Sequence, residues 1–196
     1  LHRVASVNSR FCRISEDETL WIRMDLGNKA LRRGSIGKVF SRGLIILRLA
    51  QARIQSPLFE SHFVVAGFQT KLQYLDLSMA SIDETSLAQL LSTCRLLKKL
   101  SLEQLKIDVN VCKEVAENKD LEVLNLAMCE GLEIEGLKIM MKKLQSLTAA
   151  NISWTSLSSE SMKVLVTSIA SSIMRLNIAG SRRALNDSSE LYEILL

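Results

Sequence analysis

The feature that most constrains this chain is a seven-residue pattern that recurs along almost its whole length. Apolar side chains occupy the first, fourth and sixth positions of each copy. The copies lie at 21–27, 44–50, 72–78, 97–103, 121–127, 147–153 and 173–179. Their sixth positions are separated by 23, 28, 25, 24, 26 and 26 residues. Because seven copies keep this spacing, coincidental leucines in a helical protein do not explain the pattern.

The spacing is the period of a leucine-rich repeat. In a strand, the fourth and sixth positions point to one side and the third, fifth and seventh to the other. An amphipathic helical pattern follows, as at Leu87, Leu90 and Leu91. The sequence therefore predicts an α/β fold, a right-handed β/α horseshoe with parallel strands on the inner face and helices on the outer face. Cys94 and Cys129 occupy positions typical of the cysteine-containing subtype, where a cysteine is a small apolar plug.

Two departures from the pattern predict local adjustments. Ala150 stands where leucine is usual, so we expect a small void there, or a bulky neighbour such as Met174 that fills it. The 28-residue spacing contains the chain's one proline, Pro57, and predicts an added loop.

Charge is distributed unevenly along the chain. Residues 1–71 hold 12 lysines and arginines against 5 aspartates and glutamates, a net +7, whereas residues 72–196 hold 13 against 16, a net −3. The two parts are expected to face different partners. The basic residues are scattered without aromatic neighbours, which favours a solvated or protein-binding surface over a nucleic-acid surface. A nucleic-acid binder would associate through residues 1–71 with a steep salt dependence.

Neither catalysis nor a cofactor is predicted. The chain has two histidines and no P-loop, HExxH or dinucleotide-binding motif. The four cysteines are far apart, without CxxC pairs or histidines at metal-ligand spacing, so we expect reduced, buried thiols and no metal site. Reduced thiols, and a first segment that lacks the apolar centre of a secretion signal, favour the nucleus and cytoplasm.

The first residues do not fit the repeat. Leu1, Val4, Val7, Phe11 and Ile14 recur at helical spacing and predict a helix that caps the solenoid. The chain begins on an apolar residue of this helical pattern and not on methionine, which indicates a fragment of something longer.

The stretch "VASVNSRFCRISEDETLW" resembles the second half of an F-box, and it runs directly into repeats of the cysteine-containing type. The combination resembles the F-box/leucine-rich-repeat family of substrate receptors in cullin-based ubiquitin ligases. The resemblance extends over "LWIRMDLGNKAL", "LQYLDLSMASID", "NISWTSLSSESMKVLV" and "RLNIAGSRRALNDSSEL". It implies an F-box half over 1–19 and about seven repeats over 20–196, truncated at the C-terminal end.

The resemblance also implies the partners and the role. The partners are an adaptor subunit, through it a cullin scaffold, and a protein substrate, either phosphorylated or not. The role is to direct ubiquitination and degradation of cell-cycle regulators. The chain would be a non-catalytic subunit. The first half of the F-box is missing, and the family's phosphopeptide site should not be placed on this chain. The alternative is a general repeat module or inhibitor without a ligase role.

Two sets of residues are predicted to bind partners. The adaptor would contact Leu1, Val4, Val7 and Phe11, although Phe11 and Trp21 could instead hold the helix to the first repeat. The polar inner face would bind substrate through Arg23, Arg48, Tyr74, Asp76, Lys99, Glu103, Asn125, Asn151, Arg175 and Asn177. Trp154 follows its strand and is interpreted as a turn plug, with an exposed partner anchor as the alternative.

Overall fold

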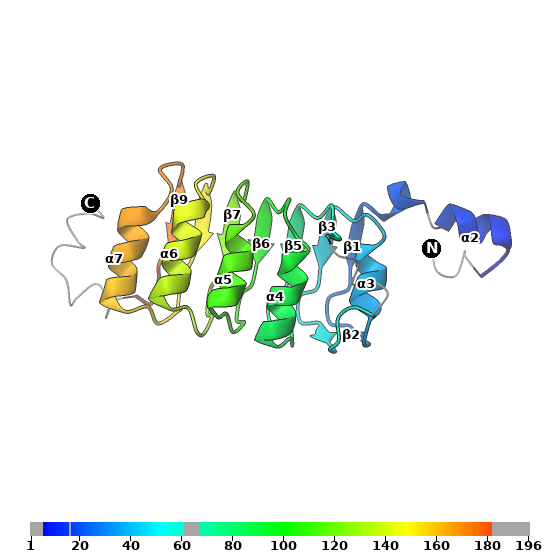
Figure 1. Ribbon diagram of the computed structural model, residues 1–196, viewed down its shortest axis with the longest axis horizontal. Helices are drawn as coiled ribbons and strands as arrows, with labels where there is room; N and C mark the ends of the chain where they lie inside the picture. The colour runs from blue at the N-terminus through cyan, green and yellow to red at the C-terminus, as the bar shows by residue number, and fades with distance from the viewer. Residues whose placement is uncertain (1–5, 16, 61–66, 182–196) are drawn as a thin grey trace.

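The chain forms a row of strand–helix units, and the sheet lies on one side of the row and the helices on the other (Figure 1). The computed structural model describes residues 6–15, 17–60 and 67–181. The main sheet has seven parallel strands in the order β1-β3-β5-β6-β7-β8-β9. This is the α/β leucine-rich-repeat fold that the sequence predicted, with a strand in each of the seven copies of the pattern.

The main strands are β1 Arg23–Asp25, β3 Ile46–Arg48, β5 Tyr74–Asp76, β6 Lys99–Ser101, β7 Val123–Asn125, β8 Ala149–Asn151 and β9 Arg175–Asn177. A second parallel pair is formed by β2 Ala30–Leu31 and β4 Arg53–Ile54. The helices are α2 Ser9–Ser15, α3 Ser35–Phe40, α4 Glu84–Ser92, α5 Val109–Ala116, α6 Ile134–Lys143 and α7 Ser159–Ser168, with a 3-10 turn at Glu18–Trp21.

Strict register turns the leucine pattern into one continuous core. The middle residues of neighbouring strands pair directly, as Leu75 does with Leu100 and Leu100 with Leu124. Leu75, Leu77 and Leu102 are fully buried. Burying a leucine side chain stabilises a fold by about 1.5–3 kcal/mol. Since every repeat contributes residues to the same rows, the core runs along the solenoid without a break.

The turn after each strand has the same backbone geometry in every repeat. The residue two places beyond the sixth position has a positive φ in all seven units: Asn28, Gln51, Met79, Gln104, Met128, Trp154 and Gly180. Such a φ is unfavourable for most residues. The backbone N–H compensates by donating to the next repeat, for example from Met79 to the carbonyl of Glu103 at 2.8 Å and from Met128 to that of Ser153 at 2.8 Å. These bonds tie the turns together in a ladder.

Four of the helices begin at a side-chain cap, and at α2 the Asn8 side chain accepts the Phe11 N–H at 2.9 Å. Asp83, Asp108 and Ser158 each accept the N–H of the residue three places on, at 2.8, 2.8 and 3.1 Å. These caps satisfy donors that a helix N-terminus leaves free. Helix α6 differs, because Glu133 at its N-cap makes no such bond.

Replacing the cap residue Asp83 with alanine should lower the free energy of unfolding by about 1 kcal/mol. Its pKa lies below the usual carboxyl value, first because the Ser86 N–H donates to it. The stabilisation is therefore present above the ordinary pKa of about 3.8 and is lost as the pH falls through the lowered value. Urea unfolding should show the difference between wild type and Asp83→Ala at neutral pH and its shrinkage in acid. Glu133→Ala is the control, and an equal loss in both variants would show that the cap is not responsible.

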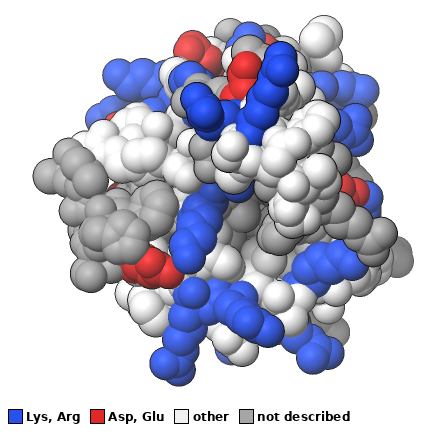
Figure 2. All heavy atoms as spheres, turned by 90° about the vertical axis from the view of Figure 1, so that its right-hand side faces the viewer, with Lys and Arg blue, Asp and Glu red and all other residues white. Residues whose placement is uncertain are grey.

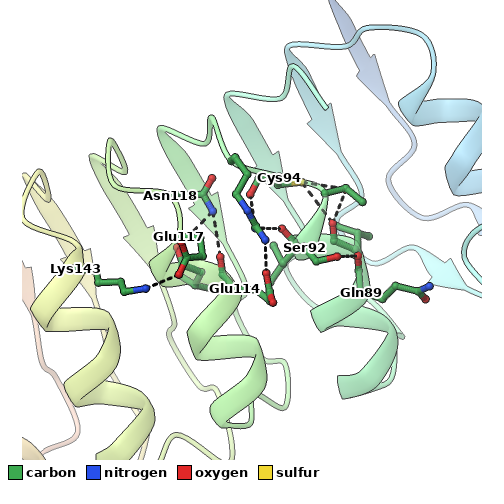
Figure 3. A network of polar contacts seen from close by, with 12 residues as sticks. Gln89, Ser92, Cys94, Glu114, Glu117, Asn118 and Lys143 are labelled. Atoms are coloured by element: carbon green, nitrogen blue, oxygen red, sulfur yellow. Dashed lines mark hydrogen bonds and ion pairs between the residues drawn. The ribbon is translucent and has the colours of Figure 1, made fainter. Parts of the chain in front are cut away.

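The edge of the solenoid at the helix C-termini is held by polar contacts between repeats (Figure 3). Asn118, just beyond α5, is fully buried and accepts the N–H of Leu97 at 3.0 Å. Arg95 donates to the carbonyls of Leu91 and Cys94 at the end of α4, both at 3.0 Å, and pairs with Glu114 of α5 at 2.7 Å. Lys143 of α6 pairs with Glu117. The end of α5 is thus connected to the ends of both α4 and α6.

Two local expectations have clear outcomes. Met174 does not fill the space beside Ala150, because it is 78% exposed, so the second of the two alternatives expected there is wrong. The expected loop between β3 and β5 contains β4, Pro57 and the buried Leu58 and Phe59, and its residues 61–66 lie outside the described part of the chain.

Candidate protein-interaction surfaces

The sheet face opposite the helices carries the side chains that the sequence assigned to it. Asp76, Glu103, Asn125 and Asn151 are half-buried, whereas the other predicted residues are exposed, namely Arg23, Arg48, Tyr74, Lys99, Arg175 and Asn177. Val123 and Ala149 occupy the same face, at the third positions of their units. We had not predicted them, although their third-position signal was present in the sequence.

Five acidic or amide residues on this face have a structural task. At the fifth position of the pattern, Asp25, Asp76, Asn125, Asn151 and Asn177 each accept the backbone N–H two residues on, at 2.9–3.2 Å. Such a bond closes a local turn. The Gly27 N–H accordingly holds the pKa of Asp25 below its usual value, and the Arg48 charge acts in the same direction. One oxygen of each side chain is therefore occupied before any partner arrives.

In the first half of the sheet the polar side chains are also paired with one another. Arg48 lies between Asp25 and Asp76, at 3.4 Å from a carboxylate oxygen of each. Further along, the Asn125 amide donates to the Ser101 hydroxyl and to Glu103, both at 3.0 Å. These contacts occupy Arg48, Asp76 and Glu103, so a partner that binds those side chains would have to displace them.

The sheet over β7, β8 and β9 is different, because it is hollowed and rich in donors. A hollow of about 600 Å³ is lined by the three strands, with the small side chain of Ala149 between Val123 and Arg175. Within the described residues, the amide NH₂ groups of Asn151 and Asn177 and the guanidinium of Arg175 make no side-chain bond. An extended peptide could place an apolar side chain in the hollow and direct carbonyl or carboxylate oxygens at these donors.

Trp154 is exposed and does not plug the turn. Counted from the start of its unit it aligns with Met128, at the positive-φ position, and its side chain is 62% exposed. The residue equivalent to Cys129 is Thr155, which is buried and donates its hydroxyl to the Ile152 carbonyl at 2.8 Å. The plug interpretation was therefore wrong by one residue. The indole lies over Gly180, where a Cβ would come within 2.7 Å of the ring.

The N-terminal helix lies beyond the first repeat, at the end of the row (Figure 1). Val7 and Phe11, two of the predicted adaptor contacts, are 67% and 43% exposed, and Leu1 and Val4 lie outside the described residues. Phe11 does not hold the helix to the repeats. That link is made by Trp21, whose indole N–H donates to the Ser15 carbonyl at 2.6 Å.

Arg42 strengthens the same link. Its guanidinium lies 4.3 Å from the centre of the Trp21 ring and donates to the Ser15 carbonyl at 3.2 Å. A cation over an aromatic face is attracted to it. The exposed apolar side chains next to this link are Val7, Phe11, Ile14, Leu20 and Ile22. Apolar residues gathered at one end of a chain in this way are a feature of association surfaces.

The cysteine thiols have a packing role in this arrangement. Cys94, Cys112 and Cys129 are buried. Burial raises the pKa of Cys112 to about 12 and that of Cys129 to about 11, so neither is a thiolate near neutral pH.

In the described residues no cluster of three or more histidine, cysteine or acidic side chains could hold a metal ion. No helix there is long and apolar enough to span a bilayer.

A comparison with protein families agrees with this architecture. Residues 34–193 match the family model described as the SKP2 LRR domain, and the match covers most of the chain. Domains of this family are non-catalytic modules of the substrate-recognition type. The match begins within the first repeat, after the segment that resembles an F-box. With seven in-register strands and a face suited to protein binding, the chain belongs to the SKP2-type leucine-rich-repeat family.

Proposed function

We propose that this chain belongs to the substrate-recognition subunit of an F-box ubiquitin ligase. Its N-terminal segment contributes to binding the adaptor, and its repeats hold a protein substrate that is a cell-cycle regulator. The observation that supports this most is the family match over the repeats. The exposed Val7 and Phe11, directly before the first repeat, support the adaptor part of the proposal.

Such a subunit promotes the reaction by holding the reactants close together. A receptor that binds adaptor and substrate together brings the substrate near the ubiquitin-carrying enzyme, and the effective concentration of the reacting groups rises. No catalytic side chain is required of the receptor. The adaptor would connect it to a cullin scaffold, and the complex would work in the nucleus and cytoplasm.

The substrate would lie on the sheet over β7–β9. Three observations favour this part of the sheet: its hollow, the apolar floor at Val123 and Ala149, and the donors of Asn151, Asn177 and Arg175, whereas Arg48 in the first half is already paired with two carboxylates. Trp154 is exposed at the margin of the same three repeats and is the proposed anchor, because large aromatic side chains dominate many interfaces.

Adaptor binding tests the proposal. The purified adaptor should co-purify with this chain once it is extended by a complete F-box, and Val7→Asp with Phe11→Asp should weaken that binding at least about tenfold by placing charges in an apolar contact. The measurement is a pull-down followed by calorimetric titration of the two proteins.

The matched control places the same number of aspartates at other exposed apolar positions. Leu96 and Met174 are 52% and 78% exposed and lie on the repeats, so Leu96→Asp with Met174→Asp should leave adaptor binding unchanged. If the extended, folded chain does not bind the adaptor, the ligase role is wrong and the chain is a repeat module of another kind. Equal weakening by both pairs would remove the N-terminal helix from the interface.

A further inference from the structure

Four cations gather at the strand-to-helix edge of the first two repeats. Lys29, Arg32, Arg33 and Arg53 are exposed, and we call them the arginine edge. Figure 2 looks onto this end of the solenoid, where lysine and arginine side chains outnumber the acidic ones. In the part of the chain that the structure describes, none of the four makes an ion pair or a side-chain hydrogen bond. Lys38 of the same repeat, by contrast, pairs with Glu60 at 3.3 Å.

The backbone brings these four residues together. Strands β2 and β4 are paired in parallel, with Ala30 opposite Arg53. The Arg53 N–H donates to the Lys29 carbonyl at 2.9 Å, and the Gln55 N–H donates to the Leu31 carbonyl at 3.1 Å. Arg32 and Arg33 follow β2 directly and, with Gln55, line a hollow of about 580 Å³. Like charges held this close repel one another, so the arrangement does not stabilise the chain itself.

The charge reverses further along the same edge. An isolated parallel β-bridge pairs Arg53 of the second repeat with Ser81 of the third, and another pairs Lys106 of the fourth repeat with Glu130 of the fifth, so this edge extends beyond the first two repeats. Glu84, Glu130 and Glu133 line a second hollow, in which Lys106 is the one cation. A positive stretch over the first two repeats is therefore followed by a largely negative one.

This reversal distinguishes a protein from a nucleic acid. A phosphodiester chain is negative throughout, so it would be attracted at the arginine edge and repelled as soon as it reached Glu84 and Glu130. The hollow at Arg32 and Arg33 also has no aromatic residue in its lining on which a base could stack. A polypeptide can change the sign of its charge within a few residues and can therefore match both stretches.

We propose that the arginine edge is a docking surface for an acidic segment of a protein partner, and that basic residues following this segment lie against Glu130 and Glu133. The surface is separate from the apolar N-terminal helix and from the sheet face. The acidic segment would dock there whether or not the chain acts in a ubiquitin ligase.

The test uses the full chain and a labelled probe peptide with a block of glutamates, a Gly–Ser spacer and a block of lysines. Fluorescence anisotropy at low salt should show saturable binding. Arg32→Glu with Arg33→Glu should weaken it at least about tenfold, because attraction becomes repulsion at the hollow. Glu130→Lys with Glu133→Lys should weaken it as well, through the other end of the peptide.

The matched control is Lys138→Glu with Lys142→Glu, which makes the same change in net charge at exposed positions of α6. This pair should leave the dissociation constant within about twofold, and circular dichroism should show all variants folded. If the Arg32/Arg33 and Lys138/Lys142 reversals weakened binding equally, net charge alone would explain the effect and the proposal would be wrong. The proposal would also be wrong if a single-stranded oligonucleotide with the same number of negative charges bound more tightly than the peptide. Absence of saturable peptide binding by the wild type would overturn it too.

Discussion

Replacing Asn118 with alanine is expected to lower the free energy of unfolding by about 2–3 kcal/mol. The side chain is fully buried at the end of α5, where its carbonyl oxygen accepts the N–H of Leu97 at 3.0 Å. Its amide donates to the carbonyls of Glu114 and Val115 at 3.3 and 3.4 Å. Alanine would leave the Leu97 N–H without this acceptor in a dry environment and would open a void. A buried donor without a partner loses its hydration and gains nothing in return.

Asn110→Ala is the matched control, since Asn110 is on the same helix but exposed and bonded only to Asp108 across 3.1 Å. Its effect should remain within about 0.5 kcal/mol. Urea unfolding followed by circular dichroism measures both variants. If Asn118→Ala were as mild as Asn110→Ala, the connection from α5 to the start of β6 would contribute little to stability. The interface between those repeats would then depend on leucine packing alone.

The positions of the strands could be predicted because a repeat solenoid places equivalent residues in equivalent surroundings. Leucines at the fourth and sixth positions can be buried only if every strand has the same orientation and register, as Leu75, Leu100 and Leu124 now do. Because side chains alternate between the two faces of a strand, the third, fifth and seventh positions can be assigned to the opposite face. The seven strands of the main sheet confirm that part of the prediction.

The polar face was identified in position but not in function. Asp or Asn stands at the fifth position in five of the seven units, and this regularity was the available signal that the residue closes the turn. Alternation shows only which side a residue faces. It does not show that Arg48 is already shared between Asp25 and Asp76, since that pairing joins strands 23 and 28 residues apart.

At Trp154, aligning the repeats by residue type gives the wrong equivalent position, whereas counting from the first position of each unit gives the right one. The interpretation of Trp154 as a turn plug treats it as the equivalent of Cys129, because both follow a strand and both could fill a turn. Counting from the first position of each unit pairs it with Met128 and pairs Thr155 with Cys129. The positive φ at that place points the side chain away from the core, so an aromatic residue there is exposed however apolar it is.

The face that the N-terminal helix presents to the repeats could not be predicted. Helical periodicity identifies an apolar stripe, but it does not say whether the stripe meets this chain or another one. In the structure Trp21 and Arg42 bond to the end of α2, and Phe11 remains exposed. That division of roles is the reason why Val7 and Phe11 are the residues changed in the adaptor experiment.

Replacing Leu124 with alanine should have the largest effect on stability, a loss of about 2–5 kcal/mol in the free energy of unfolding. Leu124 is 1% exposed and lies in the central row of the core between Leu100 and Ala150. One neighbour in that row is already an alanine, so a second alanine would create two adjacent positions without a leucine side chain. This loss combines the transfer free energy of the removed atoms with the cost of the cavity that they leave in the core.

Leu96→Ala is the control, because it removes the same atoms from a side chain that is 52% exposed. Its cost should stay below about 1 kcal/mol. Calorimetry and urea unfolding of both variants measure the difference. In a solenoid each repeat is stabilised by its neighbours, so Leu124→Ala should also broaden the transition if the interface between β7 and β8 becomes the weakest one. A loss equal to that of Leu96→Ala would show that the repeats around Ala150 close over the missing side chain, and that this half of the sheet is packed loosely enough to adapt to a partner.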